Sequence, residues 1–467
     1  MRSSIRAIAY PAAAAAILFC ALAAWWGMGT RIYLPQRLGG ADGASTATAP
    51  VSPNLHGTLT AAAGKASALT GQWPTFRGPG HDGISAASAD LARQWPAGGP
   101  PKLWQVDLGE GYAGAAVRDG RVYVVDYDQA TQADAIRCLS LDNGAEIWRY
   151  SYPVKIKRNH GMSRTTPAVS DKYVVSLGPK CHVTCLDAAT GQLVWGLDLV
   201  AQYGSAVPEW YAGQCPLIDG DRVILAPAGP QVLMMAVNLA DGQVLWQCPN
   251  PMGWKMSHAS VMPAKLAGRK QYVYPAAGGV VGVSTDGKLL WQSDQWKIKI
   301  ATVPSACPMG DDKIFLSGGY NAGAMIMQIV PAGDAQEAKV LAKLKPSVFG
   351  SEQQTPLFRD GRVYGLREDG QLVCLDGQGK VVWTSGKLGN FDKGGPYLLA
   401  GDLMYVLNDS GRLSLLEISP SGPKLLGEAD VLPEGHDAWG PMALVDGRLI
   451  LRDLKRMVCL DLRQGAK

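Results

Sequence analysis

The sequence predicts an all-β protein, an eight-bladed β-propeller of four-stranded antiparallel blades. Three observations support this fold class. Gly supplies 56 of the 467 residues, well above the average of about 7%, which indicates many turns between short strands. A Trp recurs at a nearly fixed spacing, and a separate pattern of Pro or small residues recurs eight times. Repeats of this length are typical of sheets arranged around an axis.

The first repeat marks the last strand of each unit. A turn with a Gly stands four residues before the Trp in most copies, and neighbouring copies lie 44 to 51 residues apart. These residues are Trp104, Trp148, Trp195, Trp246, Trp291 and Trp383. The interval before the last Trp is about twice the others, so one unit lacks its Trp; Leu341 stands near the gap. A large apolar residue in this register predicts packing between neighbouring blades.

The second repeat marks the first strand of each unit, which a turn and a further strand-like run follow. Its eight positions are Ala116, Pro167, Pro216, Ser260, Pro308, Pro356, Pro396 and Pro441. The last unit ends near Leu462 without a Trp strand. The orphan strand near Trp104 can supply it, so we expect the ring to close by pairing the N-terminal strand with the last blade, which removes the exposed edges.

Residues 1–30 are predicted to form a membrane or export helix. The uncharged run from Ala7 to Trp26 is 20 residues long, enough for a helix to cross a bilayer core. The length of the run and the closing pair Trp25 and Trp26 favour a retained signal anchor. The alternative is a cleaved signal peptide, with Ala21-Leu22-Ala23 as the candidate cleavage site. Both place the bulk of the chain outside the cytoplasm, in the periplasm or a comparable compartment, and the first ties it to the membrane.

Three segments follow from these patterns. Residues 1–30 are the helix, residues 31–72 form a low-complexity linker, and residues 73–467 form the propeller. The linker is rich in Ala, Gly, Ser and Thr and has few large apolar residues, which predicts a flexible tether.

Composition excludes several functional classes. The 44 basic and 40 acidic residues give a net charge of only +4, so the concentrated positive charge of a nucleic-acid binder is absent. The nine Cys residues form no CxxC pair, which argues against a disulfide framework. Where a Cys recurs in the third strand of a unit, we expect a small apolar filler between blades.

Two segments resemble a known family. The run LDAATGQLVW at residues 186–195 resembles the repeat of the PQQ-like, or quinoprotein alcohol dehydrogenase-like, β-propeller family. The leader WPTFRGPGHDG at residues 73–83 is similar to that of extracytoplasmic members. The resemblance covers nearly all of residues 73–467 and implies the propeller fold. It leaves function open, because the family holds quinoprotein dehydrogenases and also non-enzymatic scaffolds, including a propeller lipoprotein of outer-membrane assembly.

The connections between units carry the candidate binding residues. Each connection runs from the outer strand of one blade to the inner strand of the next, so all eight open on one face of the ring. Aromatic and charged side chains gathered at such a face are typical of a binding site. The candidates are Tyr112, His160, Arg164, Trp210, Trp254, His258, Trp296, Glu352, His436, Asp437 and Trp439.

We therefore expect a non-enzymatic propeller that binds a protein, peptide or glycan of the cell envelope through this face. It would act as a monomer, without nucleic acid, metal or cofactor. The alternative is a quinoprotein dehydrogenase that oxidises an alcohol or sugar. As the resemblance implies, that enzyme would need PQQ on an aromatic floor, calcium held by Glu and Asn side chains, and an Asp base. A buried Glu, Asn and Asp cluster in the central channel would favour the enzyme.

Overall fold

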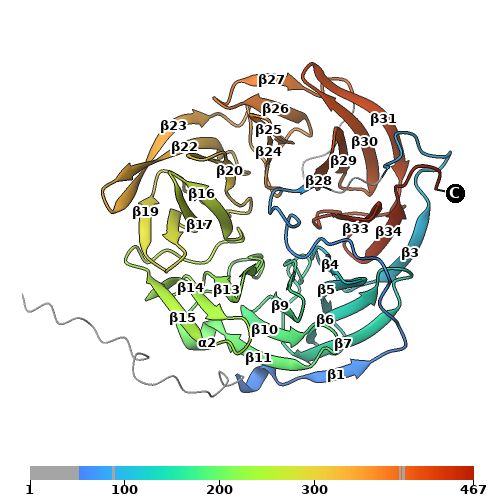
Figure 1. The fold of residues 1–467 in the computed structure, drawn as a ribbon, viewed down its shortest axis with the longest axis horizontal. Helices are drawn as coiled ribbons and strands as arrows, with labels where there is room; N and C mark the ends of the chain where they lie inside the picture. Colours follow the sequence, from blue (N-terminus) through green and yellow to red (C-terminus); the bar gives the residue numbers. More distant parts are fainter. Residues whose placement is uncertain (1–51, 87–89, 389–390, 392–394, 467) are drawn as a thin grey trace, which may run out of the picture. The chain divides into compact units, whose positions relative to one another are not determined.

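The computed structural model describes residues 52–86, 90–388, 391 and 395–466, and these residues form eight β-sheets around a central axis (Figure 1). The predicted eight-bladed propeller is confirmed. The predicted helix of residues 1–30, and the predicted linker as far as residue 51, lie outside the described residues. Within the ranges given above, no helix is long and apolar enough to cross a membrane.

Each blade is an antiparallel sheet whose first strand lies nearest the axis and whose last strand lies on the rim (Figure 1). The strands of blades 1 to 4 are β4 (Ala116–Arg118), β5 (Arg121–Asp128), β6 (Ala133–Ser140) and β7 (Glu146–Pro153); β8 (Ala168–Val169), β9 (Tyr173–Leu177), β10 (His182–Asp187) and β11 (Leu193–Asp198); β12 (Leu217–Asp219), β13 (Arg222–Leu225), β14 (Val232–Asn238) and β15 (Val244–Pro249); and β16 (Met262–Leu266), β17 (Arg269–Ala276), β18 (Gly279–Ser284) and β19 (Leu289–Ser293).

Blades 5 to 8 repeat this order. Their strands are β20 (Cys307–Met309), β21 (Lys313–Gly318), β22 (Gly323–Ala332) and β23 (Ala335–Leu344); β24 (Leu357–Arg359), β25 (Arg362–Leu366), β26 (Leu372–Asp376) and β27 (Val381–Thr384); β28 (Tyr397–Ala400), β29 (Leu403–Leu407), β30 (Arg412–Ser419) and β31 (Gly422–Asp430); and β32 (Ala443–Val445), β33 (Arg448–Arg452) and β34 (Arg456–Asp461).

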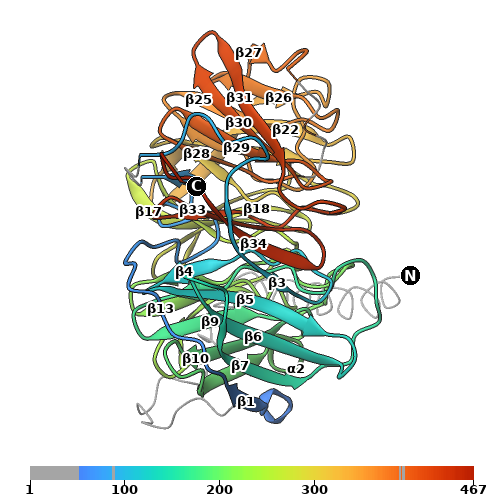
Figure 2. The same ribbon diagram turned by 90° about the vertical axis from the view of Figure 1, so that its right-hand side faces the viewer.

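The outermost strand of blade 8 comes from the other end of the chain. Strand β3 (Lys102–Asp107) pairs antiparallel with β34, and Trp104 lies opposite Cys459. Figure 2 shows the two strands side by side. Because β3 also leads directly into blade 1, this pairing joins the first and last blades.

Residues 52–72, expected to be part of a flexible linker, run along the outside of the propeller. The short 3-10 helix η1 (Pro53–Leu55) places Leu55 in the core, where it is fully buried. Strand β1 (Thr58–Ala61) then pairs with β7 as a fifth strand of blade 1 (Figure 2). For these residues the flexible-tether expectation is wrong, since main-chain pairing and the burial of Leu55 hold the segment against blades 1 and 2. Composition alone does not reveal such pairing.

The recurring Trp and Gly contact each other between blades. Gly144, Gly191, Gly242 and Gly287 have positive φ, and a Cβ on any of them would come within 2.6 to 3.0 Å of the Trp indole of the preceding blade. The missing Trp belongs to blade 5, and Gly379 of blade 6 instead meets Leu344 of blade 5. Leu341, which the sequence placed near the gap, is 51% exposed. We call the Gly–Trp contacts the inter-blade docks.

The leader, residues 73–85, crosses the central channel. Trp73 exchanges two main-chain hydrogen bonds with Val117 of blade 1, and Val169 of blade 2 donates to the carbonyl of Pro74. Arg77 donates to two carbonyls at the start of blade 6, and β2 (Ile84–Ser85) pairs parallel with β28 of blade 7. Blades 2 and 6 lie opposite each other in a ring of eight, so the leader spans the axis.

Candidate functional site: a pocket on the propeller axis

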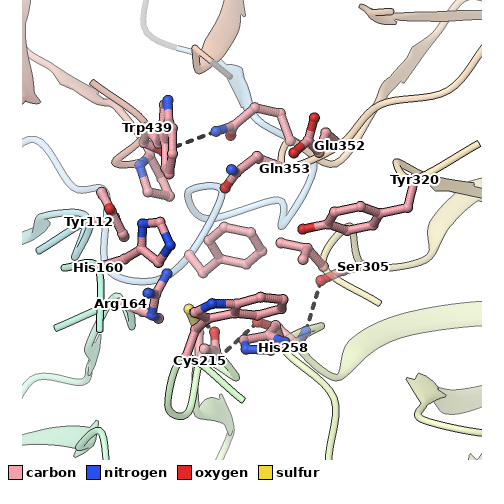
Figure 3. Close-up of a pocket in the computed structure, with 17 residues that line it drawn as sticks. Tyr112, His160, Arg164, Cys215, His258, Ser305, Tyr320, Glu352, Gln353 and Trp439 are labelled. Atoms are coloured by element: carbon pink, nitrogen blue, oxygen red, sulfur yellow. Dashed lines mark hydrogen bonds between the residues drawn. The ribbon is translucent and has the colours of Figure 1, made fainter. Parts of the chain in front are cut away.

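A pocket of about 220 Å³ lies on the axis, at the face where the inter-blade connections meet (Figure 3). Most of its lining residues come from connections of different blades. Phe76 of the leader also contributes to the wall, so the segment that crosses the channel helps to close the pocket. The lining residues are Phe76, Tyr112, His160, Arg164, Trp210, Gly213, Cys215, His258, Ser260, Val303, Ser305, Tyr320, Glu352, Gln353, Gln354, Trp439 and Pro441.

One wall is an aromatic pair held by hydrogen bonds. The rings of Tyr112 and Trp439 lie 4.9 Å apart between centroids, inclined by 30°. The Tyr112 hydroxyl donates to Asp437 at 3.3 Å and accepts from the backbone of Gly161 at 3.2 Å. The indole N–H of Trp439 donates to Asp409. These bonds fix both rings, so the wall is already formed before a ligand arrives.

Arg164 lies against this wall, with its guanidinium carbon 4.8 Å from the centroid of the Tyr112 ring. The pair forms a cation–π contact. Burial lowers the pKa of Arg164 to about 10, so its side chain still carries a positive charge at neutral pH.

A hydrogen-bonded belt lines the channel at the start of five successive inner strands. In each step, a backbone N–H donates to the side chain at the equivalent position of the next blade. The steps are Thr166 to Cys215 at 3.2 Å, Cys215 to Ser260, Ser260 to Ser305, and Ser305 to Thr355, the last three at 2.9 Å. Small hydroxyl and thiol residues recur here because their side chains accept hydrogen bonds from backbone N–H groups that do not pair with a neighbouring strand.

A further wall is set by His258. Burial lowers the pKa of His258 to about 4, and the positive charge of Arg164 acts in the same direction. The neutral ring donates its Nε2–H to the carbonyl of Glu209 at 2.7 Å. This bond holds the connection that carries Trp210, whose ring centroid lies 6.2 Å from that of His258.

Several pocket residues have left-handed backbone conformations. His160, Trp210 and Tyr320 line the pocket with φ of 57°, 62° and 58°. Bulky residues rarely adopt this region, and such strain collects at binding sites, where the surrounding structure maintains it.

Seven of the predicted candidates line the pocket. They are Tyr112, His160, Arg164, Trp210, His258, Glu352 and Trp439. Asp437 lies one contact further out, as the acceptor for Tyr112. The other three lie elsewhere. His436 lines a separate surface depression, Trp254 packs on Gly278 and Gly279, and Trp296 is 5% exposed in the core between blades 4 and 5. These last two aromatic side chains pack against the blades instead of lining the pocket.

Sequence reasoning missed part of the lining. Tyr320 lies in the turn between β21 and β22, which opens on the same face as the connections because antiparallel strands alternate in direction. Applying that alternation would have found it. No sequence pattern places Phe76 at the pocket, because the path of the leader across the channel depends on contacts with blades that lie far along the chain.

The donor set of the pocket does not fit calcium-bound PQQ. Calcium takes six to eight oxygen ligands, several of them from carboxylates. Among the 17 lining residues, Glu352 is the one carboxylate. The described residues contain no group of three or more His, Cys, Asp or Glu side chains arranged to hold a metal. The eight cysteines in the described ranges are free and buried. Those in third strands, Cys138, Cys185, Cys374 and Cys459, have the burial expected of fillers between blades.

Repeat, fold and pocket together define the class: an eight-bladed propeller with PQQ-like repeats and a pocket on its axis. The resemblance to the PQQ-like propeller family is confirmed, since residues 132–337 match the family described as "Outer membrane protein assembly factor BamB". A relative with that name from Moranella endobia (strain PCIT) is 22% identical over 330 residues, which cover 67% of this chain and 68% of the relative.

Solved structures show the same fold. BamB from Moraxella catarrhalis superimposes with a TM-score of 0.53 at 14% identity, over 77% of this chain and 99% of that chain. Quinohemoprotein alcohol dehydrogenase from Comamonas testosteroni gives 0.57 at 14% identity, over 84% and 81%. At such identities the likeness concerns the fold alone, and it extends to proteins with and without enzymatic names.

Proposed function

We propose that this chain is a non-enzymatic binding propeller of the cell envelope, which recognises a protein or peptide segment through the face where its inter-blade connections meet. The axial pocket is the observation that carries the proposal. It combines aromatic walls, left-handed backbone positions and a single carboxylate, a composition suited to recognition. The relatives named for outer membrane protein assembly support a role in assembling envelope proteins.

The proposal includes the location and the partners. The predicted helix of residues 1–30 would anchor the chain to the membrane and leave the propeller outside the cytoplasm. The partner would be another envelope protein, and no cofactor would take part. A polysaccharide partner is the competing outcome for the same surface.

Site-specific photo-crosslinking in the full-length chain tests this proposal. A benzoylphenylalanine at Tyr320, which is 37% exposed at the pocket rim, is compared with one at Asp360, in the turn between β24 and β25 on the opposite face. We expect the same envelope protein to be captured from Tyr320 in cells and with purified components, and not from Asp360. Trp439→Ala should reduce capture from Tyr320 while the unfolding temperature shows that the ring is intact.

Three results would contradict the proposal. Equal capture from both faces would show nonspecific contact, and displacement of the captured protein by a soluble polysaccharide would indicate a glycan site. Oxidation of an alcohol or sugar with PQQ and Ca²⁺, followed with a reducible dye, would restore the dehydrogenase alternative.

A further inference from the structure

In two buried arginines beside the channel, every guanidinium nitrogen donates to a backbone carbonyl. Arg77 donates to the carbonyls of His81, Asp82, Thr355 and Pro356 at 2.7 to 3.2 Å. Arg452 donates to the carbonyls of Gly109, Ala113, Asp453 and Leu454 at 2.8 to 3.5 Å. In both, backbone oxygens compensate the buried charge, so each side chain ties one segment of chain to another.

Arg164 differs from both. Its Nε and Nη2 atoms are buried and have no hydrogen-bond partner among the described residues. The groups that act most strongly on its pKa, apart from burial, are Tyr112, Tyr320 and Tyr211, and none of these is a carboxylate. A guanidinium carries five N–H donors in a planar fork, and unpaired buried donors are costly. Arg164 therefore keeps unused donors in a side chain that lines the pocket.

The belt supplies a further donor on the same pocket. The hydroxyls of Ser260 and Ser305 each accept a backbone N–H. The Ser260 side chain also bonds to that of Cys215, whereas the O–H of Ser305 has no acceptor among the described residues and can donate to a ligand. Both residues line the pocket. Glu352, the one carboxylate of the lining, lies across the pocket from Arg164 (Figure 3). Among the 17 lining residues, the Arg164 side of the pocket thus carries a cation and no carboxylate, which suits an anion.

We propose that the pocket binds a carboxylate carried beside an apolar or aromatic group, as at the C-terminal end of a peptide, with Arg164 as the ion partner of the carboxylate. The rings of Tyr112 and Trp439 form the apolar wall for the neighbouring group. This inference rests on the proposed function, because it names the part of a partner that would enter the pocket.

Geometry favours this ligand over other anions. The flat guanidinium matches the two oxygens of a carboxylate in a bidentate pair. The aromatic rings offer no partner to a bare inorganic ion but complement a planar or apolar substituent. A pocket of about 220 Å³ accommodates one amino-acid-sized group, and its position at the connection face admits the end of a chain.

Calorimetric titration of the full chain tests the inference. The probe is N-acetyl-L-phenylalanine, and the matched control ligand is its amide, which lacks only the negative charge. Inorganic phosphate and galacturonate serve as competitors. We expect the acid to bind and to change tryptophan fluorescence, the amide to bind about 10- to 100-fold more weakly, and neither competitor to displace the acid at comparable concentration.

Variants assign the effect to one residue. Arg164→Met should weaken binding of the acid by the same factor. The affinity of Arg164→Lys for the acid should lie between those of the parent protein and Arg164→Met, since lysine keeps the charge and loses the planar pair of donors. Arg158 is the matched control: it lies on the same connection and already pairs with Glu110 at 2.6 Å. Arg158→Gln should therefore leave binding unchanged.

Equal binding of acid and amide, or unchanged binding by folded Arg164→Met and Arg164→Lys, would overturn the inference. Displacement by phosphate or galacturonate would also overturn it, in favour of a general anion site or an acidic sugar site. If the titration fails but photo-crosslinking from Tyr320 still captures a partner, only this inference is overturned. If the carboxylate binds but no partner is captured from Tyr320, only the protein-partner role is overturned.

Discussion

Two buried arginines interact with Tyr112: its hydroxyl acts on the pKa of Arg452, and the guanidinium of Arg164 lies over its ring. Burial lowers the pKa of each arginine to about 10. Their partners differ. Arg452 donates to the carbonyls of Gly109 and Ala113 and so fixes the segment that carries Tyr112. By contrast, two guanidinium nitrogens of Arg164 have no partner among the described residues. One guanidinium therefore stabilises the native state, and the other is retained at the expense of stability.

This difference predicts stability changes of opposite sign. For both side chains, a pKa lowered from 12.5 to about 10 means that burial disfavours the charged form by about 3 kcal/mol. Around Arg452 four carbonyls compensate this penalty, whereas no described residue accepts from Nε or Nη2 of Arg164. That penalty is present below pH 10 and fades as the pH rises through the folded pKa. The cation–π contact offsets about 1 kcal/mol of it. Arg164→Met should therefore raise the free energy of unfolding at pH 7 by about 1–3 kcal/mol.

Arg452→Met should instead lower the free energy of unfolding by about 3–5 kcal/mol, because it leaves several buried carbonyls unpaired. Urea denaturation at pH 7 compares both variants with the parent protein. Similar destabilisation by the two substitutions would show that Arg164 is a structural residue like Arg452.

Among the structural elements, the inter-blade docks determine how neighbouring blades pack. Gly242 has a φ of 72°, and a Cβ there would meet the indole of Trp195 at 2.8 Å. Trp195 is fully buried and donates its indole N–H to Leu239 at 2.9 Å, so the ring has little freedom to move aside. The Gly thus serves both the turn and the contact between blades 2 and 3.

A pair of substitutions separates these two roles. Gly268 has a φ of 79°, and a Cβ at this residue would meet no other atom within 4 Å. Gly268→Ala should cost only the left-handed backbone strain, about 1–2 kcal/mol. Gly242→Ala should cost about 1–3 kcal/mol more, from overpacking against Trp195. Thermal and urea unfolding measure the difference, and equal effects would show that the dock does not constrain the blades.

The spacing of Gly, Trp and Pro was enough to predict the ring, because each repeat residue serves a local turn or a contact between adjacent blades. The residue that replaces the missing Trp was not predictable: Leu344 rather than Leu341 faces Gly379, and the gap in the pattern removes the register that would identify it. In the pocket, Tyr112 and Trp439 could be predicted from their connections. Trp254 and Trp296 occur in connections of the same kind, and only the packing shows that their side chains contact the blades instead of the pocket.

At the scale of the whole molecule, the leader ties distant blades together, and Arg77 is its main polar attachment. Arg77→Met removes four hydrogen bonds to carbonyls and should lower the free energy of unfolding by about 2–4 kcal/mol. Because Phe76 lines the pocket, the same substitution should weaken binding of N-acetyl-L-phenylalanine.

Limited chymotrypsin digestion checks this attachment. We expect cleavage near Trp73 and Phe76 to become faster in Arg77→Met, while the rest of the ring stays resistant. Arg359→Gln is the control, since Arg359 bonds to Gly401 and Asp360 and forms no hydrogen bond or ion pair with the described leader, residues 73–85. Unchanged cleavage and unchanged binding in Arg77→Met would show that β2 and Trp73 hold the leader without it.

The crossing leader and the closing strand also set an order of events during synthesis. Residues 73–107 emerge early, yet Arg77, β2 and β3 find their partners only when residues 355–461 have followed. Until then Trp73, Phe76 and the open edge of β3 remain unprotected, and bringing such distant segments together is a slow step in folding. Once made, the same closure must be released before the ring can open from either end. The arrangement thus delays assembly and prolongs the lifetime of the finished propeller.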